Sequence, residues 1–349
     1  MFILIFIKWR TNVDHKQQIN EILVFVYYAG MPKHYGPIKY FLLWALLLCA
    51  ISMANSSSGD RSETFQRCLT SCLVLCKNDD SYPAKLPVYL VIFGWKCPDE
   101  CKYTCMHKVT HRAVARGRKI EQFYGKWPFI RLFGIQEPAS VLFSIGNGLG
   151  HYFGWKMFKN HVNPHYSMYS TWKLYYIISV NAWLWSAVFH TRDLTWTERL
   201  DYFGAVSLIL ASIYSSFVRI VGPEYVWRCR LFGLFIATLF CCHCGYLSLI
   251  RFDYGYNMKA SVTVGIINIV GWISWCLKNW KNRSYVWKCA FINISLFCLV
   301  ALELWDFPPI WGILDAHAIW HFTTIPFCYF WYSFILDDAR FDEKLCKVK

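Results

Sequence analysis

The chain has 349 residues, of which 56% are hydrophobic, 19% are aromatic and only 17% are charged, and its formal net charge is +14. Soluble domains carry about 25% charged residues, so this composition excludes an ordinary soluble protein and favours an all-α polytopic membrane protein. The positive charge is better explained by lysine and arginine on cytoplasmic loops than by nucleic acid, which we do not expect as a partner.

The first 54 residues have the pattern of a targeting segment rather than of a folded one. Residues 1–30 hold two apolar pieces that are too short to span a bilayer, and we interpret them as a non-structural extension. Residues 31–54 combine a basic start, an apolar run and small residues before a predicted cleavage after Ala54, as a secretory signal peptide does. If residues 1–30 are translated, this segment could instead remain as an anchor.

The region 55–130 is then expected in the lumen, where Asn55 begins a glycosylation sequon. Its six cysteines form two triplets with a spacing of four, so each triplet lies on one face of a short helix. Behind a signal peptide this pattern predicts a disulfide framework, and a zinc cluster is the alternative. The spacing does not choose among the possible pairings of Cys68, Cys72, Cys76, Cys97, Cys101 and Cys105.

A basic stretch from His107 to Arg131 links this region to the membrane domain. We interpret it as a solvated linker, and contact with an anionic lipid head group is the alternative.

Residues 131–338 contain seven apolar segments of spanning length, which predicts a seven-transmembrane-helix bundle followed by a cytoplasmic tail at 339–349. Lysine and arginine favour the loops after the first, third and fifth segments and the tail, so these are predicted to be cytoplasmic. The segments are 136–154, 172–191, 200–221, 230–249, 258–277, 286–306 and 314–336.

Polar side chains from three of these segments are predicted to meet. His317 and His321 are four residues apart in the last segment, so they share one helix face. In the predicted topology Ser186 and His190 end the second segment, and Asp201 lies at the start of the third. All five residues therefore lie just inside the lumenal face, where buried polar groups are costly and indicate a function.

Three imidazoles and a water molecule are the ligands of an open, catalytic zinc site. Asp201 would orient the water or accept its proton, and Ser186 would donate to the developing oxyanion. Such a site cleaves an ester or an amide without a covalent intermediate. In the competing mechanism Ser186 is the nucleophile and His190 its base. We interpret His243, within the sequence Cys-Cys-His-Cys, as a packing residue.

The chain resembles a known family through the motifs QFYGKWPF, QEPASVLFSIGN, NAWLWSAVFHTRD, TERLDYFGA and LDAHAIWH, together with the cysteine triplets. Over about residues 59–338 it is similar to the Per1-like family of post-GPI-attachment lipid-remodelling factors. The set Ser-x-x-x-His, Asp and His-x-x-x-His also resembles the superfamily of alkaline ceramidases and adiponectin-receptor-like (CREST) hydrolases. This resemblance implies zinc bound by His190, His317 and His321, with Ser186 and Asp201 acting on the water.

The resemblance further implies a GPI-specific phospholipase A2-like enzyme, which removes the sn-2 fatty acid from the inositol phospholipid of GPI-anchored proteins. We expect it in the Golgi or endoplasmic reticulum membrane, with GPI-anchored proteins and membrane lipid as partners and an oligomeric state that stays open. The alternatives are a ceramidase-like lipid amidase and a non-enzymatic seven-helix receptor or folding factor with structural zinc.

Overall fold

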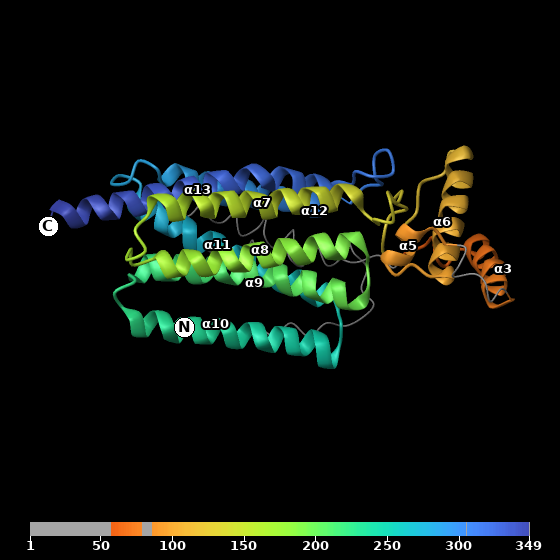
Figure 1. The fold of residues 1–349 in the computed structure, drawn as a ribbon, viewed down its shortest axis with the longest axis horizontal. Coiled ribbons are helices and arrows are strands. Elements are labelled where there is room, and N and C mark those ends of the chain that lie inside the picture. The colour runs from red at the N-terminus through yellow and green to blue at the C-terminus, as the bar shows by residue number, and fades with distance from the viewer. Residues whose placement is uncertain (1–56, 79–85, 305, 349) are drawn as a thin grey trace, which may run out of the picture. The chain divides into compact units, whose positions relative to one another are not determined.

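The computed structural model describes residues 57–78, 86–304 and 306–348. The predicted extension 1–30, the signal peptide 31–54 and the sequon residue Asn55 lie outside the described residues. Within them the regular elements are helices, joined by turns that contain isolated bridges such as Phe123 with Lys126. The all-α prediction is therefore confirmed for this part of the chain (Figure 1).

The cysteine triplets lie on two antiparallel helices, α3 (Glu63–Asn78) and α6 (Cys97–Ala115), with the short helix α5 (Val88–Ile92) between them in the sequence. Phe65 and Phe123 are buried beside the cysteines, in a core too small to be stable without cross-links. The first cysteine of each helix bonds the last of the other, which confirms the disulfide framework: Cys68–Cys105, Cys72–Cys101 and Cys76–Cys97.

Each of the seven predicted apolar segments forms a long helix, with ends that differ by several residues from the prediction. The last helix runs past the predicted end at residue 336 and through most of the predicted tail 339–349, because its polar end continues the hydrogen-bonded turns. The helices are α7 (Pro138–His161), α8 (Tyr169–Thr191), α9 (Thr195–Val221), α10 (Val226–Gly245) with the π-helical turn η2 (Tyr246–Ile250), α11 (Tyr254–Asn279), α12 (Val286–Leu304) and α13 (Ala316–Val348).

Three of these helical stretches, residues 195–221, 226–250 and 254–279, are long and apolar enough to cross a membrane by length and composition. Large apolar side chains on α10 such as Leu234 and Phe235 are exposed, as expected for helices that face lipid. The protein is therefore a membrane protein with several apolar helices, and the number of seven spans stays a prediction.

The long helices pack in a closed series. Helix α7 contacts α8 and α13, α8 contacts α9, and α9 continues through α11 and α12 back to α13 (Figure 1). Helix α10 packs chiefly against α9. Trp172 stacks on Trp272, and the ring of Trp331 packs edge-to-face against both, with ring centroids 5.1–6.3 Å apart. The predicted site residues lie on α8, α9 and α13. This packing brings them together at one end of the bundle.

The basic stretch from His107 to Arg131 is not a solvated linker throughout. Its first part belongs to α6, and its last residue is buried. Arg131 pairs with Glu100 at 2.5 Å and lies over the ring of Tyr103 at 3.7 Å. The end of the stretch is therefore held against α6.

Candidate active site

Two helix ends supply the three histidines. His190 lies in the last turn of α8, and His317 and His321 lie in the first two turns of α13. The side chain of Asp315 accepts a hydrogen bond from the backbone N–H of Ala318 at 2.8 Å, which caps the first turn of α13. This cap fixes where the helix begins, and the spacing of four then places both histidine rings on the face toward α8.

The Nε2 atoms of the three histidines converge. The Nε2 of His317 lies 3.3 Å from that of His190 and 2.8 Å from that of His321. Neutral imidazole lone pairs at such distances repel each other unless a proton or a cation lies between them. A tetrahedral zinc with bonds of about 2.0–2.1 Å needs nitrogens about 3.3–3.4 Å apart. The donor set therefore fits a metal ion, and the three residues can hold one.

Glu137, which the sequence did not single out, orients one of these histidines. It lies just before Pro138, the first residue of α7, and it is buried. Its Oε2 lies 2.7 Å from the Nδ1 of His190. A proton on Nδ1 donates to this carboxylate and leaves the Nε2 lone pair free to bind a metal, which is the usual arrangement of a carboxylate behind a ligand histidine.

Lys126 holds Glu137 in turn. Its Nζ lies 2.5 Å from the Oε1 of Glu137 and 3.0 Å from the Oδ2 of Asp193. Burial alone would lower the pKa of Lys126, but these two carboxylates raise it above its usual value. The ammonium therefore stays charged at neutral pH and balances the buried carboxylate behind His190. Lys126 belongs to the basic stretch from His107 to Arg131. Like Arg131, it is paired with carboxylates and is not part of a solvated linker.

Ser144 joins the predicted serine to the histidine cluster. Its hydroxyl donates to the carbonyl of Ser140 at 2.7 Å, so its oxygen lone pairs are left to accept. The hydroxyl of Ser186 lies 3.0 Å from this oxygen, and the Nδ1 of His321 lies 3.3 Å from it. An Nδ1 proton on His321 would again leave its Nε2 for the metal. Sequence reasoning missed Ser144, although it lies in the motif QEPASVLFSIGN.

Asp201 lies one turn into α9 and is partly buried. It is near enough to His190 and His317 to interact with both electrostatically. The structure thus brings the five predicted residues of three helices into one cluster, of which Asp201 and His317 are half-buried, and it adds Glu137, Lys126 and Ser144.

The other metal-like patterns have structural explanations. Cys241 and Cys242 are exposed, while His243 contacts the hydroxyl of Tyr256 at 3.4 Å. Cys76, Cys97 and Cys101 lie close together because two disulfides are neighbours on the same pair of helices.

Comparisons with known proteins show the family of this chain. A sequence model described as the Per1-like family matches residues 87–339. A Xenopus tropicalis protein named GPI-specific phospholipase A2-like PGAP3 is 41% identical over 307 residues, which cover 86% of this chain and 96% of that protein. The Homo sapiens protein of the same name is 41% identical over 85% of this chain and 93% of that protein. The Drosophila melanogaster post-GPI attachment to proteins factor 3 is 38% identical over 82% of this chain and 91% of that protein. No solved structure matches.

Proposed function

This chain belongs to the Per1-like family, and from that membership we propose that it remodels the lipid of GPI anchors as a phospholipase A2-like hydrolase. It cleaves the sn-2 acyl ester of the inositol phospholipid and leaves the lyso form. The observation that carries the proposal is the convergence of three histidine Nε2 atoms within the segment that the family shares. The substrates are GPI-anchored proteins, as the names of the relatives imply for those proteins.

The metal that fits this donor set best is zinc, held by His190, His317 and His321. A bound zinc ion supplies Lewis acidity, which polarises a carbonyl and lowers the pKa of water to about 7.

The remaining residues orient and move protons. The carboxylate of Asp201, which interacts electrostatically with His190 and His317, takes the proton of the attacking water and passes it to the leaving alcohol. The hydroxyl of Ser186 turns from Ser144 toward the substrate and donates to the carbonyl oxygen as negative charge develops there. Glu137 keeps a proton on the Nδ1 of His190, so that Nε2 stays a ligand.

Ser186 acts better as a donor than as a nucleophile. Its hydroxyl contacts Ser144, while both ring nitrogens of His190 are engaged, Nδ1 with Glu137 and Nε2 with His317. A serine nucleophile needs a base within hydrogen-bond reach, and His190 is committed elsewhere. Water attack without a covalent intermediate is therefore the mechanism that these contacts favour.

We also propose that seven spans cross the membrane, with the cysteine-rich region 55–130 and the site on the lumenal side and the end of α13 in the cytoplasm. Residues 31–54 then act as the signal peptide, and 1–30 have no structural role. A site just under the lumenal surface suits an acyl ester whose head group stays in water. The Golgi membrane is the proposed location, with the endoplasmic reticulum as the alternative.

The test is regiochemical. Purified protein is incubated with phosphatidylinositol that carries different acyl chains at sn-1 and sn-2, and the products are identified by mass spectrometry. We expect sn-1 lysophosphatidylinositol and the free sn-2 acid, loss of both products with 1,10-phenanthroline, and recovery with added zinc. Faster cleavage of ceramide, or release of the sn-1 chain, would contradict the proposal.

A further inference from the structure

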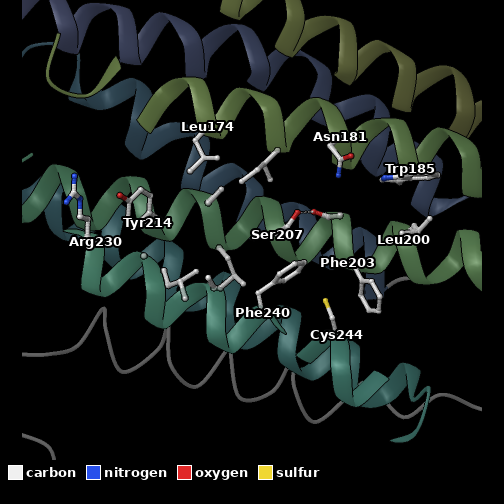
Figure 2. Close-up of a pocket in the computed structure, with 17 residues that line it drawn as sticks. Leu174, Asn181, Trp185, Leu200, Phe203, Ser207, Tyr214, Arg230, Phe240 and Cys244 are labelled. Carbon is white, nitrogen blue, oxygen red and sulfur yellow. Dashed lines mark hydrogen bonds between the residues drawn. The ribbon is translucent and has the colours of Figure 1, made fainter. Parts of the chain in front are cut away.

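A cavity lies outside the histidine site. A groove of about 750 Å³ runs between α8, α9 and α10 (Figure 2). The described residues that line it do not include the histidines, Ser186 or Asp201. Its lining includes several small residues, among them Gly204, Ala211, Gly233 and Ala237.

The groove has two different ends. Arg230 and Tyr214 lie at one end, and Trp185 and Leu200 lie at the other (Figure 2). Along α10 it reaches from Arg230 to Cys244, fourteen residues, or about 21 Å at the helical rise. One leaflet of a bilayer has a hydrocarbon thickness of roughly 15 Å, half of the whole core. The groove is therefore long enough to hold a lipid chain over the full depth of one leaflet.

The lining is mostly apolar along this length, with the amide of Asn181 as an exception, and it is positive at one end. The hydroxyl of Ser207 is satisfied by the carbonyl of Gly204 at 2.7 Å, so it adds little polarity. Arg230 is the charged residue of the lining, and no carboxylate among the described residues forms an ion pair with it. A guanidinium at the mouth of an apolar groove suits a phosphate, with which arginine forms paired, charge-assisted hydrogen bonds.

We propose that this groove binds a membrane glycerophospholipid, with one acyl chain between α9 and α10 and its phosphate on Arg230. The occupant must be a hydrocarbon chain with an anionic head, and a bilayer supplies that class of molecule at high concentration next to α10. The acyl chain fills the groove between the two helices, and so it holds α10 against α9. The lining does not include the histidines, Ser186 or Asp201, although Trp185 and Leu200 at one end are sequence neighbours of the last two, so lipid binding is measured apart from hydrolysis.

The test uses the full chain, purified in detergent, stripped of lipid and titrated with dioleoylphosphatidylserine. Native mass spectrometry counts the bound lipid. Two variants change the groove. Arg230→Ala removes the proposed phosphate contact, and Ala237→Phe blocks the space proposed for the acyl chain. Two matched controls change neighbours on α10 that do not line it, Arg228→Ala and Thr238→Phe. Size-exclusion chromatography checks that each variant is folded.

We expect one tightly bound lipid in the original protein. Arg230→Ala should weaken its binding by about tenfold, as the loss of one charge-assisted contact does, and Ala237→Phe should abolish it, while both controls bind normally. Equal binding by Arg230→Ala and Arg228→Ala would overturn the phosphate assignment, and normal binding by Ala237→Phe would overturn the groove itself. Arg230 is exposed, so Arg230→Ala is expected to fold, and it tests the phosphate assignment even if Ala237→Phe does not fold.

Discussion

Glu137 determines which nitrogen of His190 can bind a metal. A histidine has two tautomers, and a buried carboxylate 2.7 Å from Nδ1 stabilises the one with its proton there. Lys126 keeps that carboxylate from being an uncompensated buried charge. The orientation of His190, a candidate metal ligand on α8, thus depends on two residues that precede α7.

We expect Glu137→Gln to weaken metal affinity by about 10–100-fold, as the loss of a carboxylate behind a ligand histidine does. The amide can offer its NH₂ to Nδ1, which would favour the wrong tautomer. The variant should therefore lose activity at trace zinc and recover it at high zinc, with metal content measured by atomic absorption.

Glu121→Gln, at an exposed position in the turns before α7, is the matched control and should behave like the original protein. If Glu137→Gln keeps the original zinc affinity, or if zinc does not restore its activity, Glu137 has no orienting role.

At this scale the sequence predicted the residues that stand out by type and spacing. His317 and His321 share a helix face at a spacing of four, and the topology brought His190 to the same depth. Glu137, Lys126 and Ser144 were missed because each looks ordinary in the sequence. Glu137 resembles a helix-start acid, Lys126 one of many basic residues, and Ser144 a small residue for helix packing. Their roles depend on contacts between residues far apart in the chain.

Helix α13 is held beside α7 by a close approach of the two backbones. A Cβ atom on Gly154 would lie 2.1 Å from the ring of Tyr332, so only glycine fits there without a shift. Asn147 donates from its side chain to the backbone carbonyl of His321 at 2.8 Å. The packing of α7 therefore sets the position of the two histidines on α13.

We expect Gly154→Ala to destabilise the protein by about 1–3 kcal/mol, because the added methyl group forces the two helices apart. Gly148→Ala is the matched control on the same helix, since its Cβ would meet the nearest atom, of Trp183, at an ordinary 3.7 Å. Thermal unfolding followed by tryptophan fluorescence should separate the two variants, and equal midpoints would contradict this account of the α7–α13 contact.

The helices themselves were predictable from apolar length, and their ends were not. Apolar composition marks the part of a helix that lipid or the core surrounds, whereas turns continue into polar sequence as long as backbone hydrogen bonds form. Helix α13 illustrates this, since it continues from the apolar residues before Asp337 into the charged residues that follow. The cysteine spacing likewise predicted two facing helices, and the antiparallel arrangement then selects the pairing.

The two ends of the bundle carry different polar clusters. The histidine site lies where α9 and α13 begin, and an ion network lies toward their other ends. There the buried carboxylate of Asp338 contacts Arg219 at 2.7 Å, Arg283 at 3.0 Å and the hydroxyl of Tyr285 at 2.6 Å. A buried carboxylate needs such compensation. This network, which the sequence did not predict, joins α9 and α13 at the end that we assign to the cytoplasm.

The seven-span topology predicts a cytoplasmic end for α13. An epitope tag placed after Lys349 should be reached by antibody when only the plasma membrane is permeabilised, while a lumenal marker protein stays protected. A tag that is reached only after the internal membranes are also opened would mean an even number of spans, and it would move the ion network to the lumenal side.

The central claim is that the histidine cluster removes the sn-2 chain of GPI anchors, and one measurement tests it most directly. Cells without the native activity express either the original chain, His321→Ala, or the control His243→Ala, which changes a histidine outside the site. The acyl chains of one purified GPI-anchored protein are then identified by mass spectrometry. We predict that the original chain and His243→Ala remove the sn-2 chain and that His321→Ala, at equal expression, leaves it in place. Equal remodelling by all three would contradict the account.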